Sequence, residues 1–335
     1  FFAKIPKIDM ICTVRRNDAA SFCACSKGTT MNKRLATLCA CGFALGLWNN
    51  LAYADDGVEV HLPRVEHDWM TAREMATTTR AMGLANNMST SASGTSAIYH
   101  NPAAIASAMM YAIDAAYYYD NADSGHAGQI NIVDMKSNSY VGAGLGVHYQ
   151  YAAPNDHSRH YVSTRLALAV PLAGNILSLG VSAVYNYMKY NGDKVVSQFT
   201  MDTGLVVRPL DWISLGLSVQ NLIVGNHEDW MPRMITAGVA VGSLDWGVSV
   251  MFDASFNLNA NEIAKTGSYG AGIEYALKNI VPIRLGYRYE ESNHHVIAAG
   301  LGYRHDSGMI GVDLAYQHHF GFENDLFSAA LSLYF

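Results

Sequence analysis

The most constraining feature of this sequence is an alternation of apolar residues at every second position from about residue 108 to the last residue. In "YVGAGLGVHYQY" (140–151), valine, alanine, leucine and tyrosine alternate with glycine and small polar residues. The same period occurs in "ILSLGVSAVYNYM" (176–188) and "VPIRLGYRYEES" (281–292). Because successive side chains of a strand point to opposite faces, the pattern predicts strands with one apolar face and one small or polar face.

Fourteen segments follow this pattern. They start near residues 108, 128, 140, 161, 176, 195, 213, 233, 246, 268, 280, 296, 309 and 325. Short turn-like connections at 137–139, 174–175, 211–212, 244–245, 278–279 and 306–308 alternate with mostly longer polar ones, such as 153–160 and 225–232. Alternating short turns and longer loops are typical of membrane β-barrels, in which an even number of strands returns the chain to the side where it started.

A soluble protein of two packed sheets is the alternative, since its strands also alternate. It would hide the apolar faces inside, however, and would have no reason to shorten every second turn. Many of the 20 tyrosines end apolar runs, as in the aromatic girdles of membrane barrels. We therefore predict an all-β membrane protein, with a closed antiparallel transmembrane β-barrel of about 14 strands over residues 108–335.

The first 54 residues resemble an export signal. In "MNKRLATLCACGFALGLWNNLAYA" (31–54), two basic residues precede an apolar stretch too short to span a bilayer, and an A-x-A cleavage site follows. We expect 31–54 to be a signal peptide and 1–30 to be a spurious upstream extension; a genuine extra domain is the alternative. All five cysteines precede Ala54, and lipid attachment at Cys41 is a second option for this segment.

The last strand, "DLFSAALSLYF" (325–335), ends in Phe335 and resembles the signal by which the barrel-assembly machinery recognises outer-membrane barrels. Together with the signal peptide it predicts the outer membrane of a Gram-negative bacterium as the location, with membrane lipid as a partner. The chain carries a net charge of −6 and the part after residue 54 is more acidic still, which argues against nucleic acid as a partner.

Residues 55–107 do not alternate. They begin acidic, are compatible with a short helix near 69–77, and then become small and polar. A segment of this length can lie beneath a barrel or enter and block its lumen as a plug, for which the glycines on the polar strand faces leave space. Pro102 lacks an amide donor and restricts Asn101 to extended or turn conformations, so "HNPA" (100–103) predicts a bend from this segment into the first strand.

The stretch "TRAMGLANNMSTSASGTSAIYHNPAAIA" (79–106) resembles the N-terminal signature of the FadL-like and PorV/PorQ-like outer-membrane barrel superfamily. Arg80, the Met82–Gly83 pair, Tyr99 and the Asn101–Ala103 triplet match it, as does the late "PIRLGYRYEESN" (282–293). The resemblance implies a fourteen-stranded barrel with an N-terminal plug, and makes Tyr99, Asn101 and Pro102 the plug-to-barrel junction. Leu84–Ala85 and Ser93–Ser96 depart from the pattern, and the length is closer to the PorV-like branch than to fatty-acid transporters.

Charged residues fall on the predicted inner face of several strands: Arg165, Asp202, Arg208, Asp253, Glu274, Arg284, Arg288, Glu290, Arg304 and Asp313. Six of them, Glu274, Arg284, Arg288, Glu290, Arg304 and Asp313, lie on consecutive strands and can form a ladder of ion pairs. Such a ladder would brace the barrel or hold the plug. Alternatively, Arg284 or Arg288 would orient the carboxylate of a ligand, because the guanidinium binds carboxylates bidentately.

The sequence predicts neither a cofactor nor an enzyme. The adjacent histidines 294–295 and 318–319 point to opposite faces of a strand, which disfavours a shared metal ion. No G-x-S-x-G motif is present, and no Ser/His/Asp set falls on neighbouring inward positions.

Two functions remain. The first is transport of a hydrophobic, fatty-acid-like small molecule, with an apolar pocket and a lateral opening where Pro171, Pro209 or Pro282 breaks a strand. The second is a PorV-like scaffold for an exported protein partner, which would place its specificity in loops 152–160, 224–232 and 260–267. The apolar tip 230–232 would then be an exposed contact.

Overall fold

The computed structural model describes residues 76–121, 124–153, 157–173, 176–223, 231–243, 247–259, 267–290, 294–305, 308–320 and 323–335. All of them belong to one unit, Val58–Phe335, whereas a second unit, Phe1–Gly57, lies outside the described residues. The predicted upstream segment, the signal peptide and residues 55–75 of the predicted plug, with most of its expected helix, therefore lie outside the described part as well.

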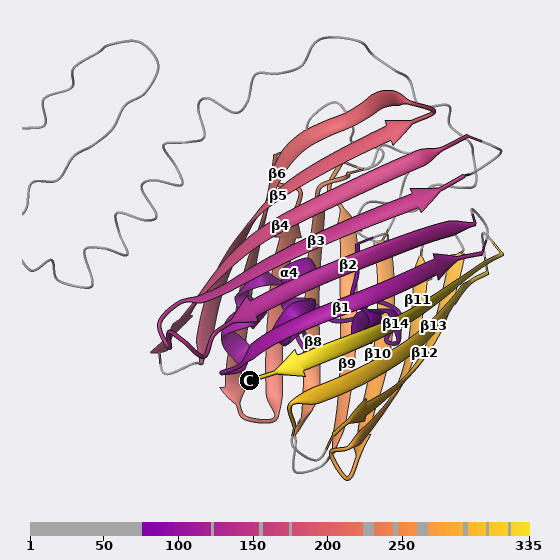
Figure 1. Ribbon diagram of the computed structural model, residues 1–335. Helices are drawn as coiled ribbons and strands as arrows, with labels where there is room; N and C mark the ends of the chain where they lie inside the picture. Colours follow the sequence, from indigo (N-terminus) through magenta and orange to yellow (C-terminus); the bar gives the residue numbers. More distant parts are fainter. Residues whose placement is uncertain are drawn as a thin grey trace, which may run out of the picture. The chain divides into compact units, whose positions relative to one another are not determined.

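Fourteen strands form one closed antiparallel barrel, in which each strand pairs with its sequence neighbours and β1 pairs with β14 (Figure 1). This confirms the predicted fold class. The strands are β1 Tyr111–Asp120, β2 Gly125–Asp134, β3 Gly142–Ala152, β4 Arg159–Leu172, β5 Leu177–Tyr190, β6 Asp193–Leu210, β7 Ile213–Gln220, β8 Met234–Ser243, β9 Val248–Asn257, β10 Gly267–Leu277, β11 Val281–Glu290, β12 His294–Arg304, β13 Ile310–His319 and β14 Asn324–Tyr334.

Every strand begins within three residues of its predicted start. The predicted alternation of short turns and longer loops is only partly right. The connections 221–233 and 258–266 are long, but β5 and β6 are joined by the two-residue turn Asn191–Gly192. Both turn residues have positive φ, 49° and 90°, as in tight hairpins. Polar residues expected in a loop here extend the strands instead, so that β6 reaches 18 residues.

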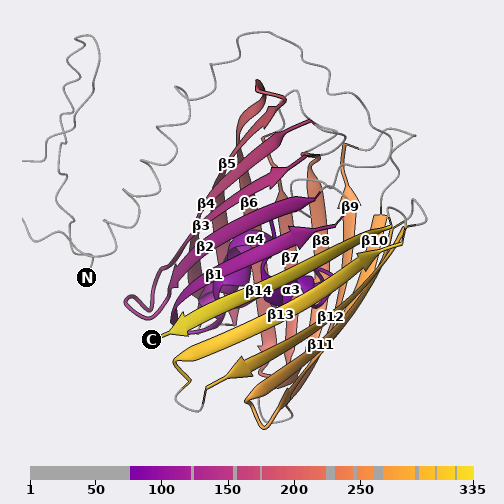
Figure 2. The same ribbon diagram turned by 45° about the vertical axis from the view of Figure 1, so that its right-hand side comes forward.

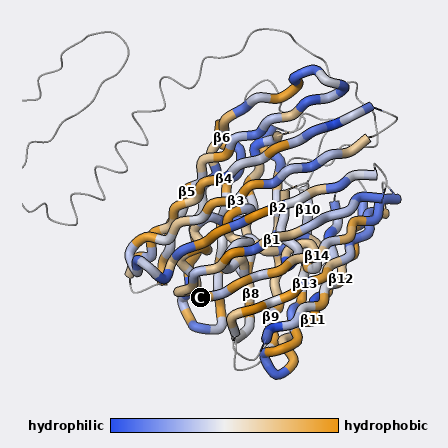
Figure 3. Tube along the Cα trace, viewed as in Figure 1, coloured by the Kyte–Doolittle hydropathy of each residue, from blue (hydrophilic) through white to orange (hydrophobic). Residues whose placement is uncertain are grey.

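The apolar side chains of the strands face outward. Figure 3 shows that hydrophobic and hydrophilic positions are interspersed along the strands. Ile130 is 60% exposed and Leu285 57%, whereas alternate positions are buried and carry glycine, alanine or polar residues. Exposed apolar side chains around a closed barrel are what a lipid environment selects, since closure satisfies the strand hydrogen bonds. Among the described residues, no helix combines the length and the apolar composition required to cross a membrane.

Residues 76–107 form a compact inner segment that the strands surround (Figures 1 and 2). It contains α3 Thr79–Met82, η1 Gly94–Ser96, α4 Ala97–His100 and η2 Pro102–Ser107. The helix α3 lies against β12, β13 and β14, whereas η2 lies against β3, β4, β5 and β6 on the other side. The assignment of this segment as a plug that closes the lumen stays a prediction.

The inner segment touches the wall at glycines that face inward. A Cβ atom at Gly180 would overlap the backbone of Pro102 and Ala103, and one at Gly286 would overlap the backbone of Leu84 and Ala85. At four other wall glycines a Cβ would first overlap side chains: Asn101 at Gly204, Thr90 at Gly216, Asp253 and Ser89 at Gly238, and Asn87 at Gly270. The wall glycines therefore leave room for the backbone of the inner segment at Gly180 and Gly286, and for polar side chains at the other four positions.

Candidate functional site

The site starts at α3, the first helical turn of the inner segment. Thr78 caps its N-terminus by accepting a hydrogen bond from Ala81 N, and the Thr79 hydroxyl hydrogen-bonds Ser328 Oγ on β14 at 2.6 Å. Gly83, which follows α3, approaches the wall so closely that a Cβ there would lie 3.0 Å from Gly300 Cα on β12. These contacts hold the side chain of Arg80 toward the wall strands β10–β13.

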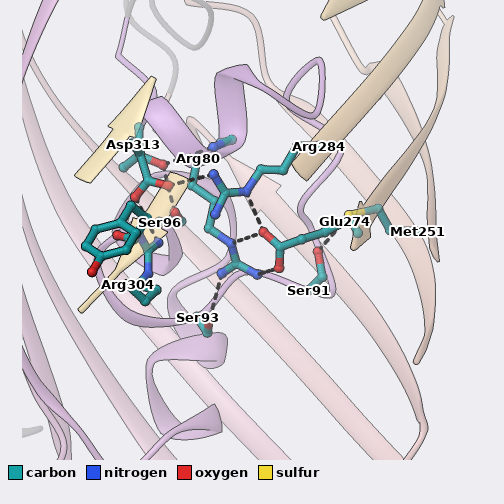
Figure 4. A network of polar contacts seen from close by, with 12 residues as sticks. Arg80, Ser91, Ser93, Ser96, Met251, Glu274, Arg284, Arg304 and Asp313 are labelled. Carbon is teal, nitrogen blue, oxygen red and sulfur yellow. Dashed lines mark hydrogen bonds and ion pairs between the residues drawn. The ribbon is translucent and has the colours of Figure 1, made fainter. Parts of the chain in front are cut away.

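Arg80 is one end of a chain of ion pairs, here called the ionic cluster (Figure 4). Its guanidinium donates to both Glu274 oxygens at 2.9 and 3.1 Å, and Glu274 also accepts from Arg284. Arg284 Nη1 donates to Asp313 Oδ1 at 2.6 Å, and Arg304 Nη2 donates to the other Asp313 oxygen at 2.8 Å. The cluster therefore joins the inner segment to four consecutive strands.

The ionic cluster is held away from solvent. The side chains of Arg284 and Asp313 are 2% and 4% exposed, and those of Arg80 and Glu274 are 23% and 16% exposed. Burial opposes the charge of Arg80, yet the Glu274 carboxylate, with Asp313 and Tyr334, raises the pKa of its guanidinium above the ordinary value. Each charge of the cluster has an opposite charge within hydrogen-bond distance, which offsets part of the desolvation cost.

Four of the six predicted lumen residues, Glu274, Arg284, Arg304 and Asp313, meet in this cluster. The other two, Arg288 and Glu290, form their own ion pair near the C-terminal end of β11, with 2.9 Å between Arg288 Nη2 and Glu290 Oε1. Arg288 Nη1 also donates to Ala85 O at 3.5 Å. The sequence interpretation missed Arg80 as a partner. Its signal was a single arginine in an otherwise uncharged inner segment, since a buried charge requires a counterion.

The three predicted junction residues lie inside the inner segment, on the side away from the ionic cluster. Asn101 caps η2, accepting from Ala103 N at 3.1 Å, and its amide donates to Ser89 O at 2.7 Å and to Leu205 O at 3.2 Å on β6. Pro102 is the first residue of η2, a position that tolerates its missing donor. Because η2 follows, β1 begins only at Tyr111, so the expected bend directly into the first strand is wrong.

Tyr99 is fully enclosed. Its hydroxyl donates to Asn131 Oδ1 at 2.7 Å, its carbonyl accepts from Gln220 Nε2 at 2.7 Å, and the Arg165 guanidinium lies 5.2 Å from its ring centroid. Burial raises the pKa of the Tyr99 phenol well above its ordinary value, so it stays protonated. Arg165 in turn pairs with Asp202 at 2.7 Å, which anchors this end of the inner segment to β4 and β6.

A groove of about 550 Å³ lies on the lipid-facing side of the wall, across β11–β14 and β1. Its rim consists of outward-facing side chains, among them Tyr117, Leu285, Leu301, Leu314 and Phe327. Its lining also includes three residues with buried side chains, Arg284, Ala315 and Ser328, and the half-buried Gly300. The groove is thus an apolar depression that reaches into the wall.

The floor of the groove is also the surface against which α3 packs. Gly300 faces Gly83, Ser328 is bonded to Thr79, and Arg284 belongs to the ionic cluster. Three floor residues therefore connect the lipid side of the wall to the inner segment. Because they carry small or ion-paired side chains, only the sheet itself separates the groove from α3.

The three prolines considered for a lateral opening differ in whether the strand pairing is regular around them. Pro171 and Pro282 stay in register with Ser178 and Ala276, whereas Pro209 lies where the pairing of β6 with β7 shifts between Val207 and Leu210. The expectation of an exposed tip at 230–232 is wrong for Met231, which is 1% exposed and packs with Tyr161, Met188 and Val196. Trp230 lies outside the described residues.

No protein-family model and no curated protein sequence matches the chain. Solved structures do. The chain is 14% identical to the CymD monoaromatic hydrocarbon channel over 78% of this chain and 97% of that one, with a TM-score of 0.60. It is 13% identical to a FadL homologue of Pseudomonas aeruginosa over 77% of this chain and 98% of that one, with a TM-score of 0.57. It is 12% identical to the toluene transporter TbuX of Ralstonia pickettii over 76% of this chain and 96% of that one, with a TM-score of 0.52. The chain therefore has the fold of the FadL-like outer-membrane barrels, which confirms the resemblance inferred from its sequence motifs.

Proposed function

We propose that this protein is an outer-membrane barrel that passes a hydrophobic small molecule across the outer membrane. The observation that carries the proposal is the apolar groove in the β11–β14 wall, whose floor is packed against α3. A groove open to lipid collects molecules that partition into lipid, and α3 behind the thin wall is the element that would have to shift to admit them.

The chemistry of the groove indicates the class of ligand. The groove is lined mostly by apolar side chains. Of its three tyrosines, Tyr117 and Tyr316 already hydrogen-bond His126 and Asp325 through their hydroxyls, so shape and burial of apolar area would supply most of the affinity. Two solved structures that share the fold are named for the passage of monoaromatic hydrocarbons and of toluene. We infer a compact hydrocarbon or an acyl chain as the ligand, with the fatty-acid-like class as one member of that range.

The ionic cluster supports a role in holding the inner segment. Both arginines considered as carboxylate ligands already have partners: Arg284 pairs with Glu274 and Asp313, and Arg288 with Glu290. A ligand carboxylate would have to displace one of these groups. We therefore propose that the cluster fixes α3 behind the groove, and that ligand recognition is apolar.

The PorV-like scaffold remains the second candidate from the sequence. Its specificity would lie in the outer loops, where residues 154–156, 224–230 and 260–266 are outside the described part of the chain. No contact described above favours it, so we keep it as an outcome of the test.

The test is uptake by a Gram-negative host that lacks its own fatty-acid channel. The initial rates of uptake of radiolabelled toluene and radiolabelled oleate are compared between cells that produce this protein and cells with an empty vector, with a labelled sugar as the polar control. We expect faster uptake of at least one hydrophobic probe and no change for the sugar. Unchanged uptake of both probes, with a folded barrel in the outer membrane and an exported protein that co-purifies with it, would support the scaffold instead.

A further inference from the structure

Three hairpins carry the same cluster of side chains on their lipid-facing side. In each, the outgoing strand has tyrosines two positions apart and the returning strand has a histidine directly opposite the second tyrosine. The clusters are Tyr117, Tyr119 and His126 on β1–β2; Tyr149, Tyr151 and His160 on β3–β4; and Tyr287, Tyr289 and His295 on β11–β12.

The geometry repeats closely. The first tyrosine hydroxyl lies 2.6, 2.9 and 2.7 Å from histidine Nδ1 in the three clusters. The ring of the second tyrosine packs against the imidazole with centroids 5.4, 5.1 and 5.2 Å apart and the ring planes tilted by 47°, 51° and 46°. Such a repeat on separate hairpins is a shared arrangement of the wall rather than a local accident of packing.

The hydrogen bond orients the protons of each imidazole. A phenol is a better donor than a neutral imidazole, and an imidazole nitrogen is the better acceptor, so the hydroxyl donates to Nδ1 and the ring proton resides on Nε2. Among the described residues, no group hydrogen-bonds Nε2 of His126, His160 or His295. His126 is exposed and the other two are half-buried, so each presents an N–H donor at the surface.

The clusters share one level of the wall. Each second tyrosine is the penultimate residue of its strand, and each histidine is the second residue of the next strand, at the end of the barrel opposite Phe335. Exposed apolar residues such as Ile130 and Leu285 lie further along the same strands. If the protein spans the outer membrane as proposed, this level is the boundary between the acyl chains and the headgroups of the outer leaflet.

A fourth hairpin carries a related cluster in which an acidic residue takes the place of the histidine. On β13–β14, Tyr316 and His318 occupy the two tyrosine positions, and Asp325 occupies the histidine position. The Tyr316 hydroxyl donates to Asp325 Oδ1 at 2.6 Å, and His318 Nδ1 lies 2.8 Å from the same oxygen. Here the chain itself supplies an anionic oxygen to a tyrosine and a histidine at this level.

We propose that the three Tyr–Tyr–His clusters bind the phosphate groups of outer-leaflet lipid headgroups, with each Nε2–H donating to a phosphate oxygen. The inference rests on the proposed outer-membrane location but not on transport. Hydrogen bonds to an ionised acceptor are stronger than neutral ones, and the two tyrosines that contact each imidazole keep its donor fixed at the headgroup level.

The test uses the purified full-length barrel and native mass spectrometry, with bisphosphorylated lipid A and chemically dephosphorylated lipid A as the two probes. The triple variant H126F/H160F/H295F keeps the rings but removes the donors. We expect wild type to retain the phosphorylated lipid preferentially, and the triple variant to lose about tenfold in affinity for each site that a lipid occupies. The variant His305→Phe, exposed at the other end of the barrel, is the matched control and should behave as wild type.

A second variant set, H126Q/H160Q/H295Q, restores a donor without the aromatic ring and should recover part of the retention. Heat-modifiable electrophoretic mobility reports whether each barrel is folded. Equal retention of phosphorylated lipid by wild type and by the folded phenylalanine variant would overturn the proposal, as would equal retention of the two lipids by wild type. Uptake of toluene or oleate should be unchanged in the double variant H160F/H295F, because the tyrosines of these two clusters do not line the groove, so this proposal and the transport proposal fail independently.

Discussion

Glu274 holds together two arginines that come from distant parts of the chain. Arg80 belongs to the inner segment and Arg284 to β11, and both donate to this carboxylate, whose side chain is 16% exposed. Without Glu274, Arg284 would still have its ion pair with Asp313. Of the hydrogen bonds described for Arg80, the one to the Ser93 hydroxyl at 2.8 Å would remain. The residue with the largest role in the ionic cluster is therefore the carboxylate rather than either arginine.

We predict that Glu274→Gln lowers the free energy of unfolding by about 3–5 kcal/mol, because it leaves buried positive charge without a counterion. Arg80→Met should cost less, about 1–3 kcal/mol, since Glu274 keeps Arg284. Urea unfolding in detergent, followed by tryptophan fluorescence, measures both. Lys194→Met, at an exposed position on β6, is the control and should change stability by less than about 0.5 kcal/mol. A larger loss of unfolding free energy for Arg80→Met than for Glu274→Gln would contradict the central role of the Glu274 carboxylate.

At the level of elements, the inner segment and the wall fit each other through backbone contacts. Wall glycines accept the backbone at Pro102–Ala103 and at Leu84–Ala85, and the Asn101 amide donates to Leu205 O on β6 and Leu217 O on β7. Such contacts leave no room for a side chain. The position of α3 and η2 should therefore depend on a few wall residues that have no polar role.

We predict that Gly286→Val displaces residues 84–85 and destabilises the barrel by about 1–3 kcal/mol, as overpacking does. Limited proteolysis should then cut within residues 76–107, which wild type protects by burial. Gly128→Val is the matched control, because Gly128 also lies in a strand but a Cβ there meets nothing within 4 Å. Identical cleavage patterns for the two variants would contradict the close approach.

The sequence predicted the strands well and the contacts of the inner segment poorly. Period-two alternation is a local property, so it located every strand of the barrel. The pairing of Arg80 with Glu274 spans 194 positions, and no local pattern marks such a partner. The burial of Met231 and the extension of β6 likewise depend on neighbouring strands, because the same polar residues can end a strand or continue it.

At the scale of the whole molecule, three layers meet at one place in the barrel wall. The lipid-facing groove, the small residues of its floor and α3 lie behind one another in the β11–β14 wall, and the ionic cluster fixes the innermost layer. Exposed apolar residues around the rest of the barrel provide the membrane contact. Passage of a hydrophobic molecule would then require the groove to be open on the lipid side.

The most direct test of this account is the initial rate of hydrophobic-probe uptake by cells that produce Ala299→Trp, compared with wild type. Ala299 lines the groove, so the indole should fill it without disturbing the inner face. Ala237→Trp places the same side chain at an exposed position on β8, away from the groove, and is the control. We predict that Ala299→Trp lowers uptake to the level of cells without the protein, whereas Ala237→Trp leaves it unchanged. Uptake that Ala299→Trp leaves at the wild-type rate, with equal amounts of folded barrel in the membrane, would contradict the account.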